Sequence, residues 1–331
     1  MDELTIVTGG AGFIGSHLVE RLVAEGRMVR VIERPGAAVD HLPGSAEVVF
    51  ADIREREGLD RAMRGARWVY HLAANPNLWA RDRSEFDRVN RQGTIHVLDA
   101  ALSAGVERVL HTSTESILTR KRMAGPIDEN IRIEPEDTVG PYCLSKLMAE
   151  RYAFALAGAG HPVVVANPTM PVGPGDRGLS PPSRLLLDFC LGKLPAAIDC
   201  TLNLIDVRDV ATGLHRVMER GEPGRRYVLG HANVTLVGLL EEMGRLIGRP
   251  APRWRVPYSV GLMVAIASEF WADRISGRMP KATVTGLRLT QRLMHFETSR
   301  TRQELGLEPR PISDSLRDAV EWFRQVGRIP V

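Results

Sequence analysis

A glycine-rich turn near the N-terminus constrains this chain more than any other stretch. The residues LTIVTGGAGFIGSHL place Gly9, Gly12 and Gly15 between a strand-like apolar run and a segment with helical periodicity. Gly9 allows a tight turn, Gly12 lets the backbone approach a ligand closely, and Gly15 lets the helix pack on the strand. Backbone N–H groups at such a helix N-terminus bind phosphate. We expect the turn to hold a dinucleotide pyrophosphate through Gly9, Gly12, Phe13, Ile14 and Gly15.

An acidic residue follows the second predicted strand and bears on the choice of cofactor. Glu33 comes directly after the apolar run Val29–Ile32, eighteen residues beyond Gly15. A carboxylate at this point accepts hydrogen bonds from the adenosine ribose hydroxyls of NAD and repels the 2′-phosphate of NADP. Arg34 follows directly and could attract that phosphate. The sequence therefore favours NAD, with NADP as the alternative.

Composition excludes several other classes of protein. The chain has 331 residues, of which 44% are apolar and 25% charged, with a formal net charge of +3. These values are ordinary for a soluble globular protein of one large domain or two unequal lobes. Basic residues are scattered, so we expect no nucleic-acid partner. Cys143, Cys190 and Cys200 lack the spacing of a metal site or a disulfide framework, and the N-terminus shows no signal peptide. We therefore expect a cytoplasmic protein without a metal.

Strand-like and helix-like segments alternate over the first half of the chain, which predicts an α/β fold with a doubly wound parallel (Rossmann) sheet. We expect a dinucleotide-binding domain over residues 1–166, to which a segment near 201–217 returns. After Asn167 the prolines are frequent, and residues 167–331 are expected to form mainly a smaller C-terminal α/β lobe that binds substrate, with strands near Asn203–Val207 and Tyr227–Leu229. The remaining predicted strands are Glu47–Phe50, Trp68–Leu72, Val109–His111 and Val163–Val165, and the helices Phe13–Val23, Arg54–Met63, Asn90–Ala104 and Tyr142–Leu156.

Two more strand ends are expected to contact the cofactor. Asp52 and Ile53 follow the third strand, where an aspartate can accept a hydrogen bond from the adenine amino group. Asp52 is also expected to cap the helix that follows. The fourth strand leads into Leu72, Ala73 and Ala74, whose small size would let a dinucleotide lie across the strand end. His71, within that strand, is expected to be a packed core residue.

A tyrosine and a lysine four residues apart carry the expected chemistry. Tyr142 and Lys146 would share one face of a helix. A free phenol has a pKa near 10, and lowering it by about three units requires roughly 4 kcal/mol. A neighbouring ammonium together with the positive ring of an oxidised nicotinamide can supply energy of that order. Thr114, 28 residues upstream in a run of hydroxyl side chains (Thr112, Ser113, Thr114), could hold the substrate oxygen.

Together these motifs resemble the extended short-chain dehydrogenases/reductases, the family of NAD-dependent epimerases and dehydratases. The resemblance implies a catalytic triad of Thr114, Tyr142 and Lys146, and it matches Asn90 to the asparagine that opens the fourth helix. Asp209 in VRDVA matches an aspartate of the second lobe. Thr112, Pro168 and Thr169 are also expected beside the cofactor. The segments Asn167–Asp176 and Ser299–Pro309 resemble the hopanoid-associated sugar epimerase branch, close to dihydroflavonol reductase-like and hydroxysteroid dehydrogenase-like enzymes.

Departures from the family pattern bear on the substrate. Sugar-nucleotide members usually carry an arginine where this chain has Leu202, although Arg177 or Arg184 could replace it, and Asp206 stands where a histidine is common. Asn167 and Met170 are expected near the substrate. An apolar pocket, or alternatively the core of the lobe, is expected from Met170, Leu179, Leu185–Leu187, Phe189, Phe270 and Trp271. The pattern favours interconversion of a secondary hydroxyl and a ketone on a lipid-like or polycyclic substrate.

Other functions stay open at this point. A redox-neutral nucleotide-sugar epimerase shares the same motifs. Glu115 follows Thr114 directly, as the acid of some 4,6-dehydratases does, but Ser116 replaces their second acid. An exposed or structurally paired Glu115 fits the sequence better than a catalytic one. A non-catalytic cofactor-binding scaffold is the least favoured option, because a scaffold would not require an intact Thr–Tyr–Lys set.

Two surfaces could make further contacts. The most apolar stretch, Val260–Ala267 with Phe270 and Trp271, is expected to be a buried or pocket-lining helix, with a helix on a membrane surface as the alternative. It is shorter than the roughly 20 residues needed to span a bilayer. Relatives dimerise through the fourth and fifth helices, so we expect a homodimer with contacts from Ala100, Ala101, Ala149, Phe154 and Leu156.

Overall fold

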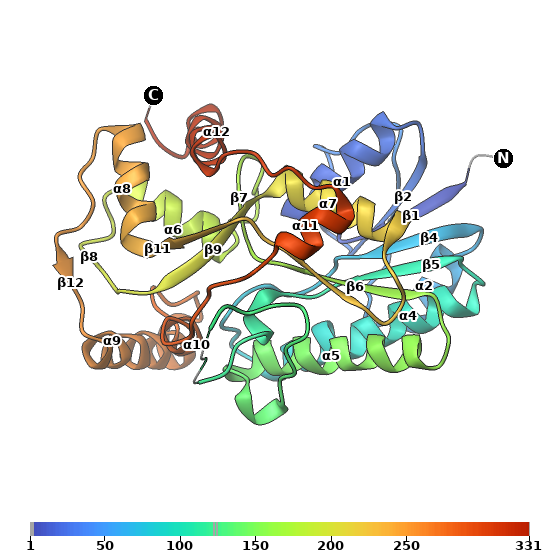
Figure 1. Cartoon of the computed structure of the whole chain (residues 1–331), viewed down its shortest axis with the longest axis horizontal. Coiled ribbons are helices and arrows are strands. Elements are labelled where there is room, and N and C mark those ends of the chain that lie inside the picture. Colours follow the sequence, from blue (N-terminus) through green and yellow to red (C-terminus); the bar gives the residue numbers. More distant parts are fainter. Residues whose placement is uncertain (1–2, 122, 124, 331) are drawn as a thin grey trace.

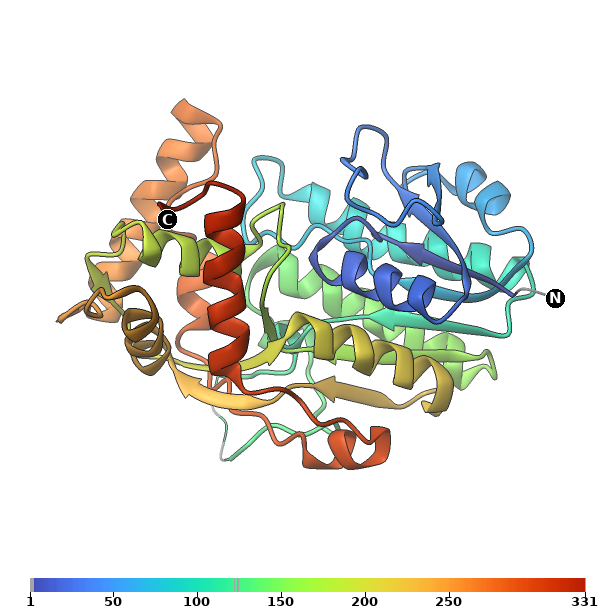
Figure 2. The same cartoon turned by 90° about the horizontal axis from the view of Figure 1, so that it is seen from above.

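The chain folds into two unequal lobes that lie side by side (Figure 1). The structure, a computed structural model, describes residues 3–121, 123 and 125–330. The larger lobe is built around a broad sheet with helices on both faces. The smaller lobe contains two short sheets and most of the C-terminal helices (Figure 2).

The large sheet has seven parallel strands in the order β10-β6-β5-β4-β1-β2-β3, so the predicted doubly wound α/β fold is confirmed. The expectation that the strand near Tyr227–Leu229 belongs to the smaller lobe is wrong, because it pairs with β6 at the edge of this sheet. The strands are β1 (Leu4–Thr8), β2 (Met28–Glu33), β3 (Glu47–Phe50), β4 (Ala66–His71), β5 (Arg108–Thr112), β6 (Val163–Pro168) and β10 (Arg226–Leu229).

Helices cover both faces of the large sheet (Figure 1). One face carries α1 (Phe13–Ala24), α7 (Val207–Arg220) and α11 (Ser299–Leu305), and the other carries α2 (Arg56–Ala62), α4 (Gly93–Ser103) and α5 (Gly140–Gly158). Successive strand residues face opposite layers, so Val7 packs in the first core cluster and Ile6 in the second. Burial on both faces explains why these strands read as continuous apolar runs.

The smaller lobe has its own core. Its main sheet has the order β11-β9-β7, and β12 pairs with β8 beside it. Leu186, Phe189, Leu204, Leu239 and Phe323 belong to the core between this sheet and the helices. The elements are β7 (Met170–Val172), β8 (Ala196–Ala197), β9 (Thr201–Asp206), β11 (Ala232–Thr235), β12 (Trp254–Arg255), α6 (Pro181–Cys190), α8 (Leu236–Ile247), α9 (Tyr258–Trp271), α10 (Val284–Leu289) and α12 (Ile312–Gln325).

The segment 201–217, expected to return to the large lobe, divides between the two lobes. Its strand β9 lies in the small sheet, whereas α7 packs on α1, β5 and β6 of the large lobe. Asp206 joins the two parts, since its side chain accepts a hydrogen bond from the Arg208 backbone at the start of α7. Shorter helical turns are α3 (Ser84–Phe86), a π-helical turn at Asp87–Gln92, another at Ala272–Ser276, and 3-10 turns at Glu115–Ile117 and Pro135–Asp137.

Two sequence-based expectations about surfaces are wrong. Helix α9 is not buried, because Phe270 is 62% and Trp271 58% exposed. Ala100, Ala101 and Ala149 cannot supply dimer contacts, because they are buried inside the monomer. Within the described residues, no helix combines the length and apolarity needed to cross a bilayer.

Candidate active site

A large cavity lies at the carboxyl ends of the large-sheet strands, between the two lobes. Its volume is about 1140 Å³. The strand order reverses at β1, between β4 and β2, and ligands of doubly wound folds bind at this kind of switch point. We call the lining residues between positions 9 and 146 the large-lobe wall, and those between 168 and 294 the small-lobe wall.

The glycine turn forms one end of the large-lobe wall. Gly9 has a φ of +71°, and a Cβ there would lie 2.7 Å from the backbone nitrogen of Ala73. A Cβ on Gly15 would lie 2.1 Å from the carbonyl oxygen of Gly9, so both positions require glycine. Gly12 caps α1 without a side-chain hydrogen bond, and the first turn of that helix carries no acidic residue. Phe13 and Ile14 line the cavity beside it.

Glu33 is fixed against the glycine turn. Its carboxylate accepts a hydrogen bond of 2.8 Å from the backbone N–H of Ala11. Burial raises the pKa of Glu33, against the lowering effect of that hydrogen bond and of Arg34. Arg34 also lines the cavity. The carboxylate and the guanidinium therefore stand at the same end of the cavity.

Asp52 and Ile53 line the cavity next to Glu33, but the predicted helix cap is wrong. The helix begins at Arg56, and Glu55 occupies its N-cap position. Asp52 instead accepts hydrogen bonds from the backbone N–H of Arg54 at 2.9 Å and from its Nε at 2.9 and 3.0 Å. The Arg54 guanidinium lowers the pKa of Asp52, so the carboxylate is anionic at neutral pH.

The end of β4 passes directly beneath the glycine turn. Leu72, Ala73 and Ala74 all line the cavity. His71 is a core residue as predicted: it is buried, and its ring nitrogens hydrogen-bond Thr8 at 2.8 Å and Thr94 at 2.9 Å. Burial lowers its pKa to about 3, so the ring is neutral.

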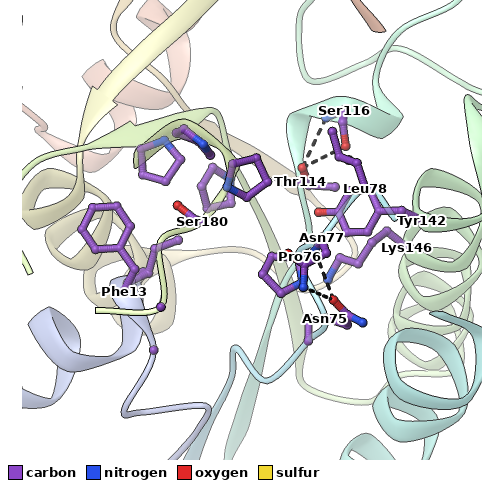
Figure 3. Close-up of a pocket in the computed structure, with 18 of the residues that line it drawn as sticks. Phe13, Asn75, Pro76, Asn77, Leu78, Thr114, Ser116, Tyr142, Lys146 and Ser180 are labelled. Carbon is purple, nitrogen blue, oxygen red and sulfur yellow. Dashed lines mark hydrogen bonds between the residues drawn. The ribbon is translucent and has the colours of Figure 1, made fainter. Parts of the chain in front are cut away.

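Helix α5 brings Tyr142 and Lys146 to the middle of the cavity. Figure 3 shows the Tyr142 oxygen directed into the cavity, toward Thr114, with Lys146 beside the ring. The Tyr142 ring packs against Phe86 with 6.1 Å between centroids. Lys146 Nζ donates to the carbonyl oxygen of Thr112 at 2.8 Å, and burial lowers its pKa to about 8. The two side chains thus lie on one helix face, as their spacing predicts.

The expected lowering of the Tyr142 pKa is not found in the protein alone. Burial raises the pKa of Tyr142 above its ordinary value of 10, and the charge of Glu115 adds to the rise. The phenol is therefore neutral in the free protein. The sequence-based argument required two cations, and the second of them belongs to an oxidised cofactor.

The side chains of Thr114, Glu115 and Ser116 form a small polar group opposite Tyr142. Thr114 Oγ1 donates to Glu115 Oε2 at 3.0 Å and lies 3.1 Å from Ser116 Oγ. Burial raises the pKa of Glu115 to about 7. Glu115 is partly buried and lines the cavity, and among the described residues no cation forms an ion pair with it.

The predicted substrate residues are only partly brought together. Met170 and Leu202 line the small-lobe wall, and Pro168 and Thr169 lie beside them. Asn167 does not line the cavity; its amide donates to the Thr114 carbonyl at 3.1 Å and to Glu150 at 2.7 Å. Arg184 lies outside the cavity lining as well, whereas Arg177 is part of it. Of the remaining apolar candidates, Leu185 lines the cavity, and Leu179, Leu186, Leu187 and Phe189 belong to the core of the lobe.

Two lining segments were missed by sequence reasoning. The first is the loop Asn75–Leu78 after β4, where Asn90 Oδ1 accepts from the Asn75 backbone at 2.8 Å. The second runs from Lys281 to Met294 and includes α10. The one feature of the sequence that could have indicated the first loop is Asn90, because its side chain binds the backbone of that loop. The second carries no motif and reaches the cavity only through the fold of the smaller lobe.

The large-lobe wall fits a nicotinamide dinucleotide. The glycine positions at which a Cβ would clash leave backbone free to face a pyrophosphate, and Glu33 and Asp52 stand at the strand ends where a ribose and a base would lie. Within the part of the chain that the structure describes, Thr112 Oγ1 and Ser113 Oγ are buried and have no hydrogen-bond partner, and the Thr112 carbonyl contacts Lys146. The residues present therefore suit this group.

Comparison with known proteins gives the family. The sequence profile of the NAD dependent epimerase/dehydratase family matches residues 5–230. The chain belongs to this family. Its members are NAD(P)-dependent enzymes, so the predicted enzymatic character and the predicted cofactor NAD are confirmed.

Full-length relatives have diverse names. A Synechocystis sp. protein named as a dihydroflavonol 4-reductase is 35% identical, with 99% of this chain and 97% of that protein covered. Sterol demethylase protein B of Methylococcus capsulatus is 32% identical, covering 98% and 99%. The crystal structure of gox2253 superposes with a TM-score of 0.87 at 33% identity over 99% of both chains.

Proposed function

We propose that this protein is an oxidoreductase that interconverts a secondary hydroxyl and a ketone on a lipid-like or polycyclic molecule, using NAD. The observation that carries the proposal is the contrast inside one cavity. Tyr142, Lys146 and Thr114 lie together at its centre, and the small-lobe wall facing them is largely apolar. Its apolar lining residues include Met170, Leu185, Leu202, Leu236, Leu287, Leu289 and Met294.

Each member of the central group has a distinct proposed role. When substrate binds, the Thr114 hydroxyl turns its one proton from Glu115 Oε2 to the substrate oxygen and so positions that oxygen. In the direction of reduction, the neutral Tyr142 donates its phenolic proton to the ketone oxygen as the carbonyl carbon gains a hydride; in oxidation both transfers reverse. The nicotinamide, when bound, supplies or accepts that hydride. Lys146, held by the Thr112 carbonyl, stabilises the phenolate that remains.

The apolar wall supports the substrate class. The pyrophosphate of a nucleotide sugar is usually bound by cations, and the family resemblance places Leu202 where sugar-nucleotide members usually carry an arginine. Names of relatives point the same way, since they refer to a dihydroflavonol, a sterol and a farnesyl dihydroquinoline oxide. These are ring systems or prenylated rings rather than nucleotide sugars.

Glu33 supports NAD over NADP. Its carboxylate is fixed by the Ala11 N–H at the end of the cavity where the adenosine ribose would lie. A 2′-phosphate there would stand close to the half-buried Glu33 carboxylate and be repelled by it. NADP would be preferred only if the attraction of the 2′-phosphate to Arg34 exceeded its repulsion by Glu33.

The experiment that tests the proposal measures net cofactor turnover. Purified protein is mixed with NAD or NADH and a panel of hydroxysteroids, flavonoids and prenylated ketones, and with UDP-sugars as the contrast. We expect a change in the absorbance of reduced nicotinamide with at least one polycyclic substrate and none with the UDP-sugars. Isomerisation of a UDP-sugar without net cofactor turnover would contradict the proposal.

A redox-neutral reaction is the second candidate, favoured by two observations. Arg177 and Lys281 enter the small-lobe wall and could bind the phosphates of a nucleotide sugar. Glu115 lies beside Thr114 with a pKa raised to about 7, as an acid in a 4,6-dehydration would need. Epimerisation would leave Glu115 unused, whereas dehydration would depend on it. A non-catalytic scaffold has no observation in its favour.

We propose in addition that the protein is a cytoplasmic homodimer. Its three cysteines are free thiols, which suits a reducing compartment. Leu144 on α5 is 40% exposed, and Phe154 and Leu156 on the same helix are partly buried. With Ala100, Ala101 and Ala149 inside the monomer, these three residues are among the apolar side chains that remain for a dimer through α4 and α5. Light scattering of Leu144→Glu against the wild type tests the contact.

A further inference from the structure

Helix α9 presents its apolar side to solvent, which is the reverse of an ordinary surface helix. Val260, Met263, Val264, Phe270 and Trp271 recur at helical spacing and are 42–63% exposed. Trp254 just before the helix is 78% exposed, and Ile275 just after it is 60% exposed. The protein-facing side carries the small residues Gly261, Ala265 and Ala272. Figure 1 and Figure 2 show α9 at the edge of the smaller lobe.

Charge is distributed around this apolar side in a definite way. From Val256 to Ser268 the sequence contains no charged residue. The two acids near the end of the helix turn inward: Glu269 and Asp273 lie 3.4 and 3.2 Å from the guanidinium of Arg83. Exposed arginines stand at both ends, Arg253 and Arg255 before the helix and Arg274 and Arg278 after it. Among the described residues, only Arg255 of these four is in an ion pair, with Asp199.

We propose that this face docks on the surface of an anionic lipid bilayer. We call it the α9 patch, and it consists of the four arginines and of Trp254, Val260, Met263, Val264, Phe270, Trp271 and Ile275. A helix with an apolar face and flanking cations lies in the plane of a membrane, with the apolar side chains at the boundary of the acyl chains and the cations among the headgroups. Tryptophans at its two ends suit the interfacial region.

Self-association through the same patch is disfavoured by charge. In a twofold contact the same surface meets itself, so arginines at one end of α9 would face arginines of the other copy. Anionic headgroups neutralise these cations instead. The inner side of α9 packs on α10, and α10 lines the cavity, so the docked face backs directly onto the small-lobe wall. Docking on the bilayer does not depend on the proposed reaction. The further idea that docking serves to take up an apolar substrate from the bilayer rests on the proposed function.

Vesicle flotation tests the proposal with the full chain. We expect the protein to float with vesicles of equimolar phosphatidylglycerol and phosphatidylcholine, and several-fold less with phosphatidylcholine alone or in high salt. Phe270→Ser combined with Trp271→Ser should weaken binding by more than about tenfold. The matched control, Met28→Ser with Phe50→Ser, removes side chains of similar exposure (51% and 52%) on the larger lobe and should bind as wild type.

A second pair of variants tests the charge. Arg274→Gln with Arg278→Gln should weaken binding to anionic vesicles by about fivefold per arginine, whereas Arg64→Gln with Arg220→Gln should change it little. Brominated lipids should quench the fluorescence of Trp254 and Trp271. Equal flotation of the wild type and the Phe270/Trp271 variant would overturn the proposal. A change of that variant from dimer to monomer in the absence of vesicles would also overturn it, because the patch would then be a contact between two copies of the chain. Turnover of a detergent-soluble substrate should be unchanged in all these variants, so failure of docking and failure of the proposed reaction are separable.

Discussion

The two walls of the cavity are built in different ways. The large-lobe wall consists mainly of strand ends and the turns that directly follow them, such as the glycine turn after β1 and Asp52 after β3, together with residues of α5. The small-lobe wall is assembled from a proline-rich segment, from strands β7 and β9 of the small sheet and from the segment Lys281–Met294. The first wall repeats a geometry that a parallel sheet imposes on any such chain. The second depends on contacts between segments far apart in the sequence.

The comparison implies that the catalytic group is held in place by the large sheet, whereas the small-lobe wall can differ without moving that group. Tyr142 and Lys146 come from α5 and Thr114 follows β5, all in the large lobe, so their relative positions are set by the sheet. Selection among substrates is left to the small lobe. Variants in the large-lobe wall should therefore change rate or cofactor use, and variants in the small-lobe wall should change the substrate preferred.

Tyr142→Phe should produce the largest effect. Losing the phenolic proton removes general acid–base catalysis, so turnover should fall by about 10²–10⁴-fold while the affinity for NAD stays near that of wild type. Steady-state kinetics and NAD titration by fluorescence measure the two quantities. Tyr152→Phe, on the same helix but bonded to Asp99 outside the cavity, is the control. Full activity of Tyr142→Phe would remove this residue from the mechanism.

Glu33→Gln should change the cofactor preferred, with a smaller effect. Removing the carboxylate charge removes the repulsion of a 2′-phosphate, so the ratio of kcat/KM for NAD over NADP should fall by about tenfold. Glu20→Gln, on the exposed side of α1, makes the same change in net charge and should leave the ratio unchanged. An unchanged ratio in Glu33→Gln would mean that Arg34 decides the preference.

Leu202→Arg should change substrate preference through the other wall. A cation placed among apolar residues should lower kcat/KM for a polycyclic substrate by about tenfold, because part of the wall then needs hydration. Leu202→Met keeps the volume and should stay within about threefold of wild type. A gain of activity toward a UDP-sugar in Leu202→Arg would sharpen the contrast between the walls. No change in either variant would show that substrate does not reach this residue.

Glu115→Gln should have the smallest effect, on stability rather than rate. The pKa of Glu115 is raised to about 7 in the folded protein, so its charged form is less favourable folded than unfolded. Its contribution to stability is present at about pH 4 and is lost as the pH rises through 7. Glu115→Gln should therefore raise Tm by about 2–4 °C at pH 8 relative to wild type, and by less at pH 5. Glu136→Gln, on an exposed carboxylate, should show no such pH dependence. Loss of most activity in Glu115→Gln would instead favour the dehydratase.

The same contrast explains what the sequence could predict. The seven-stranded sheet without its last strand, the glycine turn and the Tyr142–Lys146 face follow from local patterns, because strand ends of one sheet meet at one edge. Strand β10 was assigned to the wrong lobe because nothing in its four residues specifies the partner strand β6. Asp52 was expected to cap a helix that in fact begins at Arg56, since Arg54 binds its carboxylate instead.

Residues of the small-lobe wall were harder to predict for a physical reason. Apolar residues in a lobe can pack in its core, line a cavity or face solvent, and composition does not distinguish these. Leu185 lines the cavity, Phe189 is in the core and Phe270 is on the surface, although all three were grouped as pocket candidates. Asn167 was expected near the substrate, yet it holds the Thr114 carbonyl from behind.

Deuterium transfer is the most direct test of the proposed reaction. NADH deuterated at C4 of the nicotinamide, on the transferable face, is incubated with the protein and a polycyclic ketone, and the product is analysed by mass spectrometry. The account predicts one deuterium on the carbinol carbon and one NAD formed for each alcohol released. Product that is isomerised or dehydrated, without deuterium and without net oxidation of NADH, would contradict it.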